Sequence, residues 1–333
     1  AVLAMSTTPS YDPNEPRVIA DTAARNTVEA LTGDARKAAL QLAQQTQWRN
    51  KAVSDLYEPG SVFKLITCAA ALDAGAITKH SSFYCGESIS VAGTRFHCAN
   101  HKRHGSQTVT QALENSCNQS FIQIGARLGR EAFCDYFAAF GLREPTGIDL
   151  PNETRWTSVY NAEQMAEVDT NLYTAAFGQN ESITPMQMAT AVAVCAVVNG
   201  GKLMQPYVVS EILAPDGSTI EQFSPVCKRQ VLKAETSQTM REMMEAVVLH
   251  GGGRNAQIPG YRVGGKSGTS QKLDSADEKA RIASFVAVAP IDDPQFLCLV
   301  CLDEPHSWTT AGATIPTWNW SLTSRIPVLV RLW

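Results

Sequence analysis

Apolar runs of strand character lie near both ends of this chain, and helical patterns fill the middle. The first run is 1–5, and the runs 282–289 and 296–302 flank a turn near the other end. Segment 261–269 adds another strand pattern ahead of that pair. This order predicts an α/β fold of the α+β type, in which the two ends of the chain close an antiparallel sheet. Helices cover the sheet, and a mostly helical lobe is inserted between its strands.

The same order sets the expected domain organisation of the 333 residues. We expect a single domain, with a sheet lobe from about 1–60 and 202–312 and an all-helical lobe from about 61–201. Residues 313–333 form an atypical tail, which is rich in Trp and has no amphipathic period. A shifted reading frame near residue 313 is one explanation of that tail.

Composition excludes several classes of protein. The chain is 44% hydrophobic and 18% charged, which is typical of a globular protein. Its formal net charge is −4 without a long basic run, so we expect no nucleic-acid partner. Residues 1–5 do not resemble a signal peptide, and we expect a membrane anchor to precede this sequence. The nine cysteines are irregularly spaced, so no disulfide framework is predicted.

The segment that begins at Pro59-Gly60 carries the first candidate catalytic pair. An apolar helical pattern runs from there to Gly75, which places Ser61 in the first turn and Lys64 on the same face. A neighbouring amine can activate a serine hydroxyl, and a helix N-terminus stabilises an oxyanion and favours a neutral lysine. A lone pair of this kind is more often an ordinary helix start with a solvated lysine.

Two further motifs carry related chemistry. Ser116-Cys117-Asn118 interrupts a helical pattern over 108–128 and predicts a short loop between two helices. Lys266-Ser267-Gly268-Thr269 lies on the strand pattern over 261–269. Each motif is weak alone, since a helix cap would explain the first of them, but the three together are a much stronger signal.

In this order, the three motifs resemble the set found in the transpeptidase domain of penicillin-binding proteins. Neighbouring segments are similar to the class B branch, which includes division and sporulation enzymes of Gram-positive, clostridial-like bacteria. These segments are 4–14, 57–61, 183–191 and 259–266. The resemblance covers roughly residues 1–312 and implies the penicillin-binding-protein and serine β-lactamase-like fold.

The resemblance implies a peptidoglycan D,D-transpeptidase that cross-links D-Ala-D-Ala stem peptides through a serine acyl-enzyme and is inhibited by β-lactams. Ser61 is then the nucleophile, Lys64 the base and Ser116 the proton relay. The backbone N–H groups of Ser61 and Thr269 form the oxyanion hole. The implied substrate-binding residues are Asn118, Lys266, Ser267, Gly268 and Thr269.

The resemblance also implies where such a protein works. We expect an enzyme anchored at the extracytoplasmic face of the plasma membrane, with a non-catalytic domain ahead of the catalytic one. A membrane glycosyltransferase is an expected partner, and catalysis requires no cofactor.

Other functions remain open on sequence alone. A serine β-lactamase or a β-lactam sensor domain would share the nucleophile and differ in deacylation. Residues 260–267 also match the P-loop pattern of nucleotide-binding proteins. A P-loop opens a helix, however, and no apolar helical stripe follows this segment, so the P-loop interpretation is disfavoured.

A Cys/His-rich insert over 83–104 is too irregular for core and suggests a possible structural zinc site. Cys85, Cys98 and His104 are the candidate ligands, with a fourth unassigned, while His97 and His101 lie in the same stretch. Thiolates and imidazoles suit tetrahedral Zn²⁺, and a metal stabilises a segment that has little core of its own. A disulfide between Cys85 and Cys98 is the alternative in an oxidising compartment.

Overall fold

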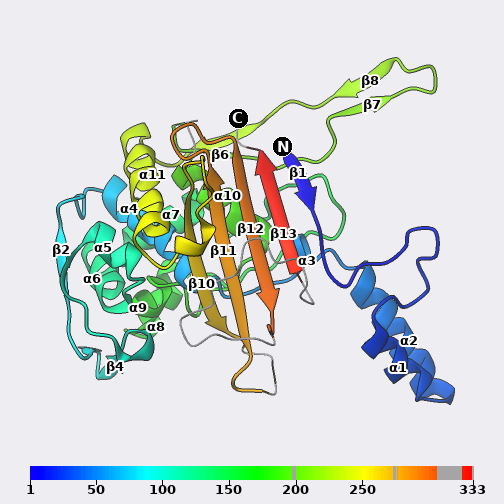
Figure 1. Ribbon diagram of the computed structural model, residues 1–333, viewed down its shortest axis with the longest axis horizontal. Helices are drawn as coiled ribbons and strands as arrows, with labels where there is room; N and C mark the ends of the chain where they lie inside the picture. Colours follow the sequence, from blue (N-terminus) through cyan, green and yellow to red (C-terminus); the bar gives the residue numbers. More distant parts are fainter. Residues whose placement is uncertain (197–199, 273–274, 276, 306–324, 332–333) are drawn as a thin grey trace.

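The computed structural model describes residues 1–196, 200–272, 275, 277–305 and 325–331. A five-stranded antiparallel sheet lies at its centre, in the order β1-β13-β12-β11-β10 (Figure 1). These strands are β1 (Val2–Met5), β10 (Gly264–Gln271), β11 (Arg281–Ala289), β12 (Phe296–Asp303) and β13 (Arg325–Arg331). Because β1 pairs with β13, the predicted closure of the sheet by both ends of the chain is confirmed.

The hairpin of β11 and β12 is the buried centre of the sheet. Ala283 pairs with Leu302, and the residues from Ala283 to Val286 are all buried. Successive residues of a strand point to opposite faces, so both faces are covered at this point. Helix α10 (Pro185–Ala196) contacts β11 and β12, while α11 (Ala234–Leu249) contacts β10.

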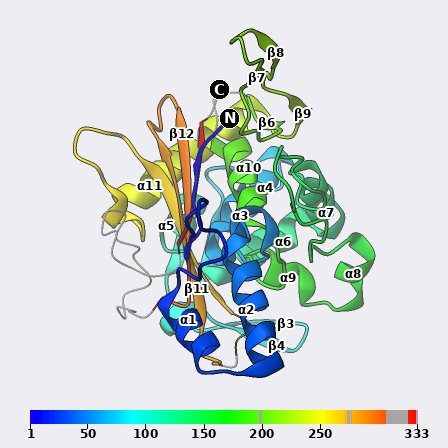
Figure 2. The same ribbon diagram turned by 90° about the vertical axis from the view of Figure 1, so that its right-hand side faces the viewer.

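Most other helices form the inserted lobe. In Figure 2, α4, α6, α7, α8 and α9 lie together on one side of the sheet. Nine of the ten residues of α4 are buried, which makes it the core of the lobe. The helices are α4 (Lys64–Asp73), α5 (Val109–Glu114), α6 (Asn118–Leu128), α7 (Arg130–Ala139), α8 (Ala162–Glu167) and α9 (Asn171–Ala175). The predicted pair of helices over 108–128 is confirmed.

The insert over 83–104 is more regular than the sequence indicated. Strand β2 (Ser82–Cys85) pairs with β5 (Gly105–Thr108), and β3 (Ile89–Val91) pairs with β4 (Thr94–Phe96). Each of these strands has only three or four residues, too few for a clear period of alternation. Contacts of β2 with α5 and α6 hold the insert to the lobe.

The tail contributes more to the sheet than we expected. Residues 325–331 supply β13, which lies between β1 and β12, so the sheet extends beyond the predicted limit at residue 312. Strand pairing uses backbone groups, and it therefore needs no helical period in the sequence. Residues 313–324 and 332–333 of that tail lie outside the described part of the chain.

Two segments project from the body of the molecule (Figure 1). One consists of α1 (Thr22–Glu29) and α2 (Gly33–Trp48), which are two helices because Gly33, at φ 58°, turns the chain between them. The other is the hairpin of β7 (Glu211–Leu213) and β8 (Thr219–Gln222), as the pattern over 207–223 predicts from its turn signal at Asp216-Gly217.

The remaining elements are short. They are α3 (Lys51–Ser54), β6 (Lys202–Met204), β9 (Cys227–Gln230), and three 3₁₀ turns at Gly60–Val62 (η1), Ala99–His101 (η2) and Arg254–Ala256 (η3). Among the described residues, none of the helices has the length and apolar character needed to cross a membrane.

Candidate active site

Ser61 lies in the 3₁₀ turn η1, directly before α4. The sequence predicted one continuous helix, but the α-helix begins only at Lys64. Gly60 has φ 55°, and a Cβ on it would lie 2.5 Å from the carbonyl oxygen of Thr269. Glycine is therefore required at this turn, because a side chain would clash with β10 and the left-handed conformation would be strained. The close contact holds Ser61 beside the strand.

Lys64 connects two of the motifs. Its Nζ donates hydrogen bonds to Ser61 Oγ at 2.9 Å, to the Ser116 carbonyl oxygen at 2.8 Å and to Asn118 Oδ1 at 2.7 Å. A further contact reaches Ser116 Oγ at 3.3 Å. The amine and the candidate nucleophile are thus already within the distance that proton transfer requires.

The two site lysines are buried, at 0% exposed for Lys64 and 1% for Lys266. Burial lowers the pKa of Lys64 to about 8, although the charge on Cys117 and Cys98 acts in the opposite direction. Burial and the neighbouring Lys64 cation hold the pKa of Lys266 well below its usual range. A neutral amine at Lys64 is therefore accessible near neutral pH, as a general base requires.

Ser116 occupies the turn between α5 and α6, where its φ is 50°. Its Oγ accepts a hydrogen bond from Lys266 Nζ at 3.0 Å and lies within reach of Lys64. Non-glycine residues seldom adopt positive φ, and such strain is concentrated at functional sites. The hydroxyl can pass a proton between either lysine and a group bound at the site.

Strand β10 borders the site on the opposite side. It is the edge strand of the described sheet, so its outer backbone groups can pair with an extended ligand. A Cβ on Gly268 would lie 2.6 Å from the Pro59 carbonyl oxygen. The strand therefore closely approaches η1, the turn that carries Ser61 and is called the serine turn. Ser267 is half-buried and Thr269 is exposed, so both remain accessible. Hydrogen bonds thus join five of the eight predicted residues, and the other three, Ser267, Gly268 and Thr269, follow Lys266 on the strand beside η1.

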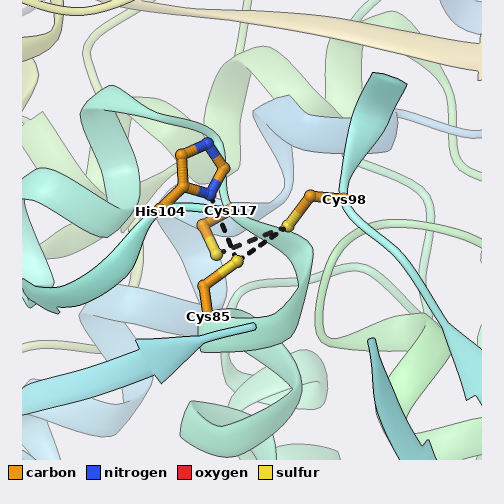
Figure 3. Close-up of side chains that lie close together, drawn as sticks. All are labelled: Cys85, Cys98, His104 and Cys117. Carbon is orange, nitrogen blue, oxygen red and sulfur yellow. Dashed lines mark hydrogen bonds between the residues drawn. The ribbon is translucent and has the colours of Figure 1, made fainter. Parts of the chain in front are cut away.

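Four side chains form a second cluster (Figure 3), and one of them, Cys117, directly follows Ser116 in the chain. They come from the end of β2, the residue before η2, the residue before β5 and the N-cap of α6, and their ligand atoms lie within 4.8 Å of one another. They are Cys85, Cys98, His104 and Cys117. The structure thus brings the three predicted ligands together and adds Cys117, which the sequence analysis had not assigned.

The cluster has the donor set of a tetrahedral metal site. Cys98 Sγ lies 3.6 Å from Cys85 Sγ and 3.5 Å from Cys117 Sγ, and Cys85 Sγ lies 3.3 Å from His104 Nδ1. Two thiolates on one tetrahedral Zn²⁺ are about 3.8 Å apart, given Zn–S bonds of about 2.3 Å. Hydrogen bonding with Cys98 lowers the pKa of Cys117, whereas the same hydrogen bond and burial raise the pKa of Cys98, and burial raises the pKa of Cys85. One of the three thiols therefore favours the thiolate that a metal binds even without an ion. The residues present fit zinc.

His97 and His101 lie outside that cluster. Their ring centroids lie 4.6 Å apart, and His97 Nδ1 contacts the Glu87 carbonyl oxygen at 3.0 Å. The His97 carbonyl oxygen accepts a hydrogen bond from Asn118 Nδ2 at 3.3 Å. The insert therefore reaches the catalytic motif through its backbone, a contact that side-chain patterns in the sequence cannot reveal.

The P-loop interpretation has no support in the fold. The second half of the matching pattern, from Gly264 onwards, is strand β10, whereas a P-loop must open a helix.

Comparison with known proteins agrees with this geometry. The profile of the family "Penicillin binding protein transpeptidase domain" matches residues 1–317. The chain belongs to this family. It is 41% identical to stage V sporulation protein D of Bacillus subtilis, over 80% of this chain and 41% of that protein. It is 31% identical to a peptidoglycan D,D-transpeptidase FtsI homologue of Mesostigma viride, over 92% of this chain and 50% of that protein.

A solved member of the family has the same fold. The imipenem acyl-enzyme complex of penicillin-binding protein A from Mycobacterium tuberculosis superposes with a TM-score of 0.73 at 26% identity, over 93% of this chain and 67% of that one. The penicillin-binding-protein fold predicted from the motifs is therefore confirmed. The chain spans half or less of the two curated relatives described above.

Proposed function

We propose that this chain is the catalytic domain of a peptidoglycan D,D-transpeptidase, which cross-links stem peptides through an acyl-enzyme on Ser61. The observation that carries the proposal is the Lys64 amine, which reaches all three polar residues of the Ser-x-x-Lys and Ser-x-Asn motifs. The family and the transpeptidase names of its relatives support the same activity.

The first half-reaction forms the acyl-enzyme. Ser61 Oγ attacks the carbonyl carbon of the penultimate D-Ala, and its proton passes to the neutral Lys64 amine. When the tetrahedral intermediate collapses, the bond to the terminal D-Ala nitrogen breaks and Ser116 relays a proton to that leaving amine. D-Ala departs, and the remainder of the stem peptide stays attached to Ser61 as an ester.

The second half-reaction transfers the acyl group. The amine of a second stem peptide attacks the ester carbonyl, loses its proton to the same lysine and serine relay, and returns Ser61 to its hydroxyl form. Two backbone N–H groups, of Ser61 and Thr269, stabilise the oxyanion in both steps. Water must attack slowly, so that the ester persists until the acceptor amine arrives.

The strand side of the site binds the donor peptide. The peptide extends along the free edge of β10, and Asn118 holds its amide. Lys266, Ser267 and Thr269 receive the terminal carboxylate, whose negative charge favours the cationic form of Lys266. A β-lactam presents a strained carbonyl and a carboxylate in the same arrangement, which makes it an inhibitor.

Labelled penicillin and intact mass test this proposal. We expect one covalent adduct per wild-type chain and none in Ser61→Ala, and we expect the adduct to outlast many minutes in buffer. A Ser61→Ala chain that still carries the label would contradict the assignment of the nucleophile. Rapid penicillin turnover would instead make the chain a serine β-lactamase, and a stable adduct without peptide transfer would favour a β-lactam sensor.

For the cluster of Cys85, Cys98, His104 and Cys117 we propose a structural Zn²⁺ site. The metal would hold the insert to the N-terminus of α6 and so keep the Ser116 turn in place, with no part in the acyl-transfer steps. Its support is a set of three buried thiols and one half-buried imidazole whose ligand atoms lie within 4.8 Å of one another. Binding energy of this kind contributes directly to folding.

Metal analysis of protein purified without chelator tests the zinc proposal. We expect about one zinc per chain, lost together with thermal stability in Cys98→Ser and in Cys117→Ser. The matched control is Cys227→Ser, because Cys227 is exposed and lies outside the cluster. Absence of metal, together with two fewer titratable thiols, would establish the alternative disulfide between Cys85 and Cys98.

We place the reaction at the extracytoplasmic face of the plasma membrane, where peptidoglycan is assembled, with a membrane glycosyltransferase as the partner that supplies new glycan strands. The relatives are named for sporulation and for FtsI, and these names support a role in sporulation or division. Co-purification from detergent extracts of the full-length protein, with and without cross-linker, tests the partner.

A further inference from the structure

The loop 178–183 packs against the serine turn and the residues that precede it. Tyr57 and Ile183 exchange backbone hydrogen bonds of 3.0 and 3.1 Å, and Gly60 N–H donates to the Gly178 carbonyl oxygen at 2.9 Å. A Cβ on Gly178 would lie only 2.0 Å from the Gly60 carbonyl oxygen. The backbone of the loop 178–183 is therefore in direct contact with the residue that precedes Ser61.

Glu58 connects the same two segments through its side chain. It is only 7% exposed, and its Oε1 accepts the Asn180 N–H at 2.9 Å. Asn180 has φ 62°, which is a costly conformation that its surroundings must maintain. The carboxyl of Glu58 thus fixes the middle of the loop, between the contacts at Gly178 and Ile183.

We propose that Glu58 is a positioning residue for acyl transfer: its carboxyl oxygen holds the loop 178–183 against the Gly60 turn and thereby sets where Ser61 Oγ points. The inference rests on the proposed acylation of Ser61. It assigns no contact between Glu58 and the substrate. A shift of about 1 Å at a nucleophile can cost about 100-fold in rate. The loop that positions Ser61 is therefore expected, like the base Lys64, to affect the acylation rate.

The surroundings of Glu58 are consistent with this role. Glu181, on the same loop, is fully buried and accepts the Tyr160 N–H at 3.1 Å. Burial raises the pKa of Glu181 to about 9, with the charge of Glu58 adding to the rise and Arg143 opposing it. Burial also raises the pKa of Glu58, and the Asn180 hydrogen bond only partly offsets this rise. The carboxyl of Glu58 can accept the Asn180 N–H with or without a charge, because a neutral carboxyl keeps an acceptor oxygen.

Three substitutions at Glu58 separate positioning from charge. Glu58→Gln keeps an acceptor oxygen at the same reach without the charge, Glu58→Asp keeps the charge but is one methylene too short, and Glu58→Ala removes both. Stopped-flow acylation with a fluorescent penicillin gives the acylation rate constant and, separately, the affinity of the preceding complex. We expect the rate constant to fall at least 10-fold in the Ala and Asp variants and to stay within about 3-fold of wild type in Gln, with the affinity unchanged in all three.

The matched control is Glu153→Ala, because Glu153 also accepts backbone N–H groups of a loop, those of Thr146 and Gly147, and has no contact with the serine turn among the described residues. We expect this variant to lower the melting temperature without slowing acylation. Equal rates for wild type and Glu58→Asp, or a Gln variant as slow as Asp, would overturn the inference, even if the Ala variant does not fold. A wild-type chain that is never acylated would instead overturn the proposed function.

Discussion

Lys64 is the residue whose protonation state should control the rate of acylation. It must be neutral to accept the proton of Ser61, and burial lowers its pKa to about 8. Because only the neutral amine is a base, the acylation rate constant should rise with pH and level off above about 8. Measuring it for labelled penicillin across that range checks the prediction, and a rate independent of pH would contradict it.

Removing the amine provides the matching experiment. Lys64→Ala should slow acylation by about 10² or more and should abolish the rise with pH, because the scale of a lost general base is about 10²–10⁴. Lys37→Ala is the control, since Lys37 is exposed and pairs with Asp34 on α2, which also carries no residue of the candidate active site. A Lys64→Ala variant that retains the wild-type pH profile would assign the base elsewhere.

Residue types and their order were enough to predict which residues lie together at the candidate active site. Ser61 and Lys64 are three residues apart on one turn, so local geometry alone brings them together. Cys117 could not be assigned in the same way, because its approach to Cys85 depends on how β2 packs against α6. The one available signal was a cysteine inside the Ser-x-Asn motif, close to a Cys/His-rich insert. Glu58 likewise gave no signal, since its partner is a backbone N–H on a distant loop.

The close approach of strand β10 to the turn η1 depends on the absence of a side chain at Gly268. A Cβ on Gly268 would meet the Pro59 carbonyl oxygen at 2.6 Å and Ser284 Oγ at 2.7 Å. Gly268→Ala should therefore push the strand away from Ser61 and lower the acylation rate constant by at least about 10-fold. The same stopped-flow assay measures this effect.

The control for that change is Gly217→Ala at the tip of the β7–β8 hairpin. Gly217 has φ 84° but no atom within 4 Å of its ideal Cβ, so the variant carries backbone strain without a clash. We expect a stability cost of about 1 kcal/mol and normal acylation. Equal acylation by the Gly268 variant and the wild type would show that the strand is not held by this contact.

At the level of elements, long periodic helices were predicted well, and short strands were not. The sequence predicts a helix over about 234–249, and the structure has α11 there, because sixteen residues give several turns of evidence. β3 and β4 have three residues each, and their pairing depends on a turn at Ala92 and Gly93, both with positive φ. The sequence predicts a single helical stretch over about 22–47, and the break at Thr32-Gly33 was missed because Ala-rich helical patterns lie on both sides of it.

The projecting β7–β8 hairpin is attached to the body by few contacts. Asp149 accepts the N–H groups of Val208 and Val209 at 2.7 and 2.8 Å, at the base of the hairpin. All seven strand residues of the hairpin are exposed, so it shares little of the core. Its attachment can therefore weaken without disturbing the active site.

Asp149→Ala tests that separation. We expect faster cleavage by a glutamate-specific protease at Glu211 or Glu221, while penicillin acylation stays within about 2-fold of wild type, because hairpins without packing are marginally stable. Asp216→Ala, at the tip, is the control and should leave cleavage at Glu211 nearly unchanged. A parallel loss of acylation in Asp149→Ala would show that the hairpin and the active site are coupled.

The place of β13 between β1 and β12 has a consequence for how the molecule is made. Val2 pairs with Val330, so the two partners leave the ribosome almost a whole chain length apart. Contacts of such long sequence separation form late and slowly. Until residues 325–331 arrive, one edge of β12 has no neighbour, and an unpaired strand edge invites association with other chains. A chaperone that shields this edge during synthesis would therefore protect the protein when it is most prone to aggregate.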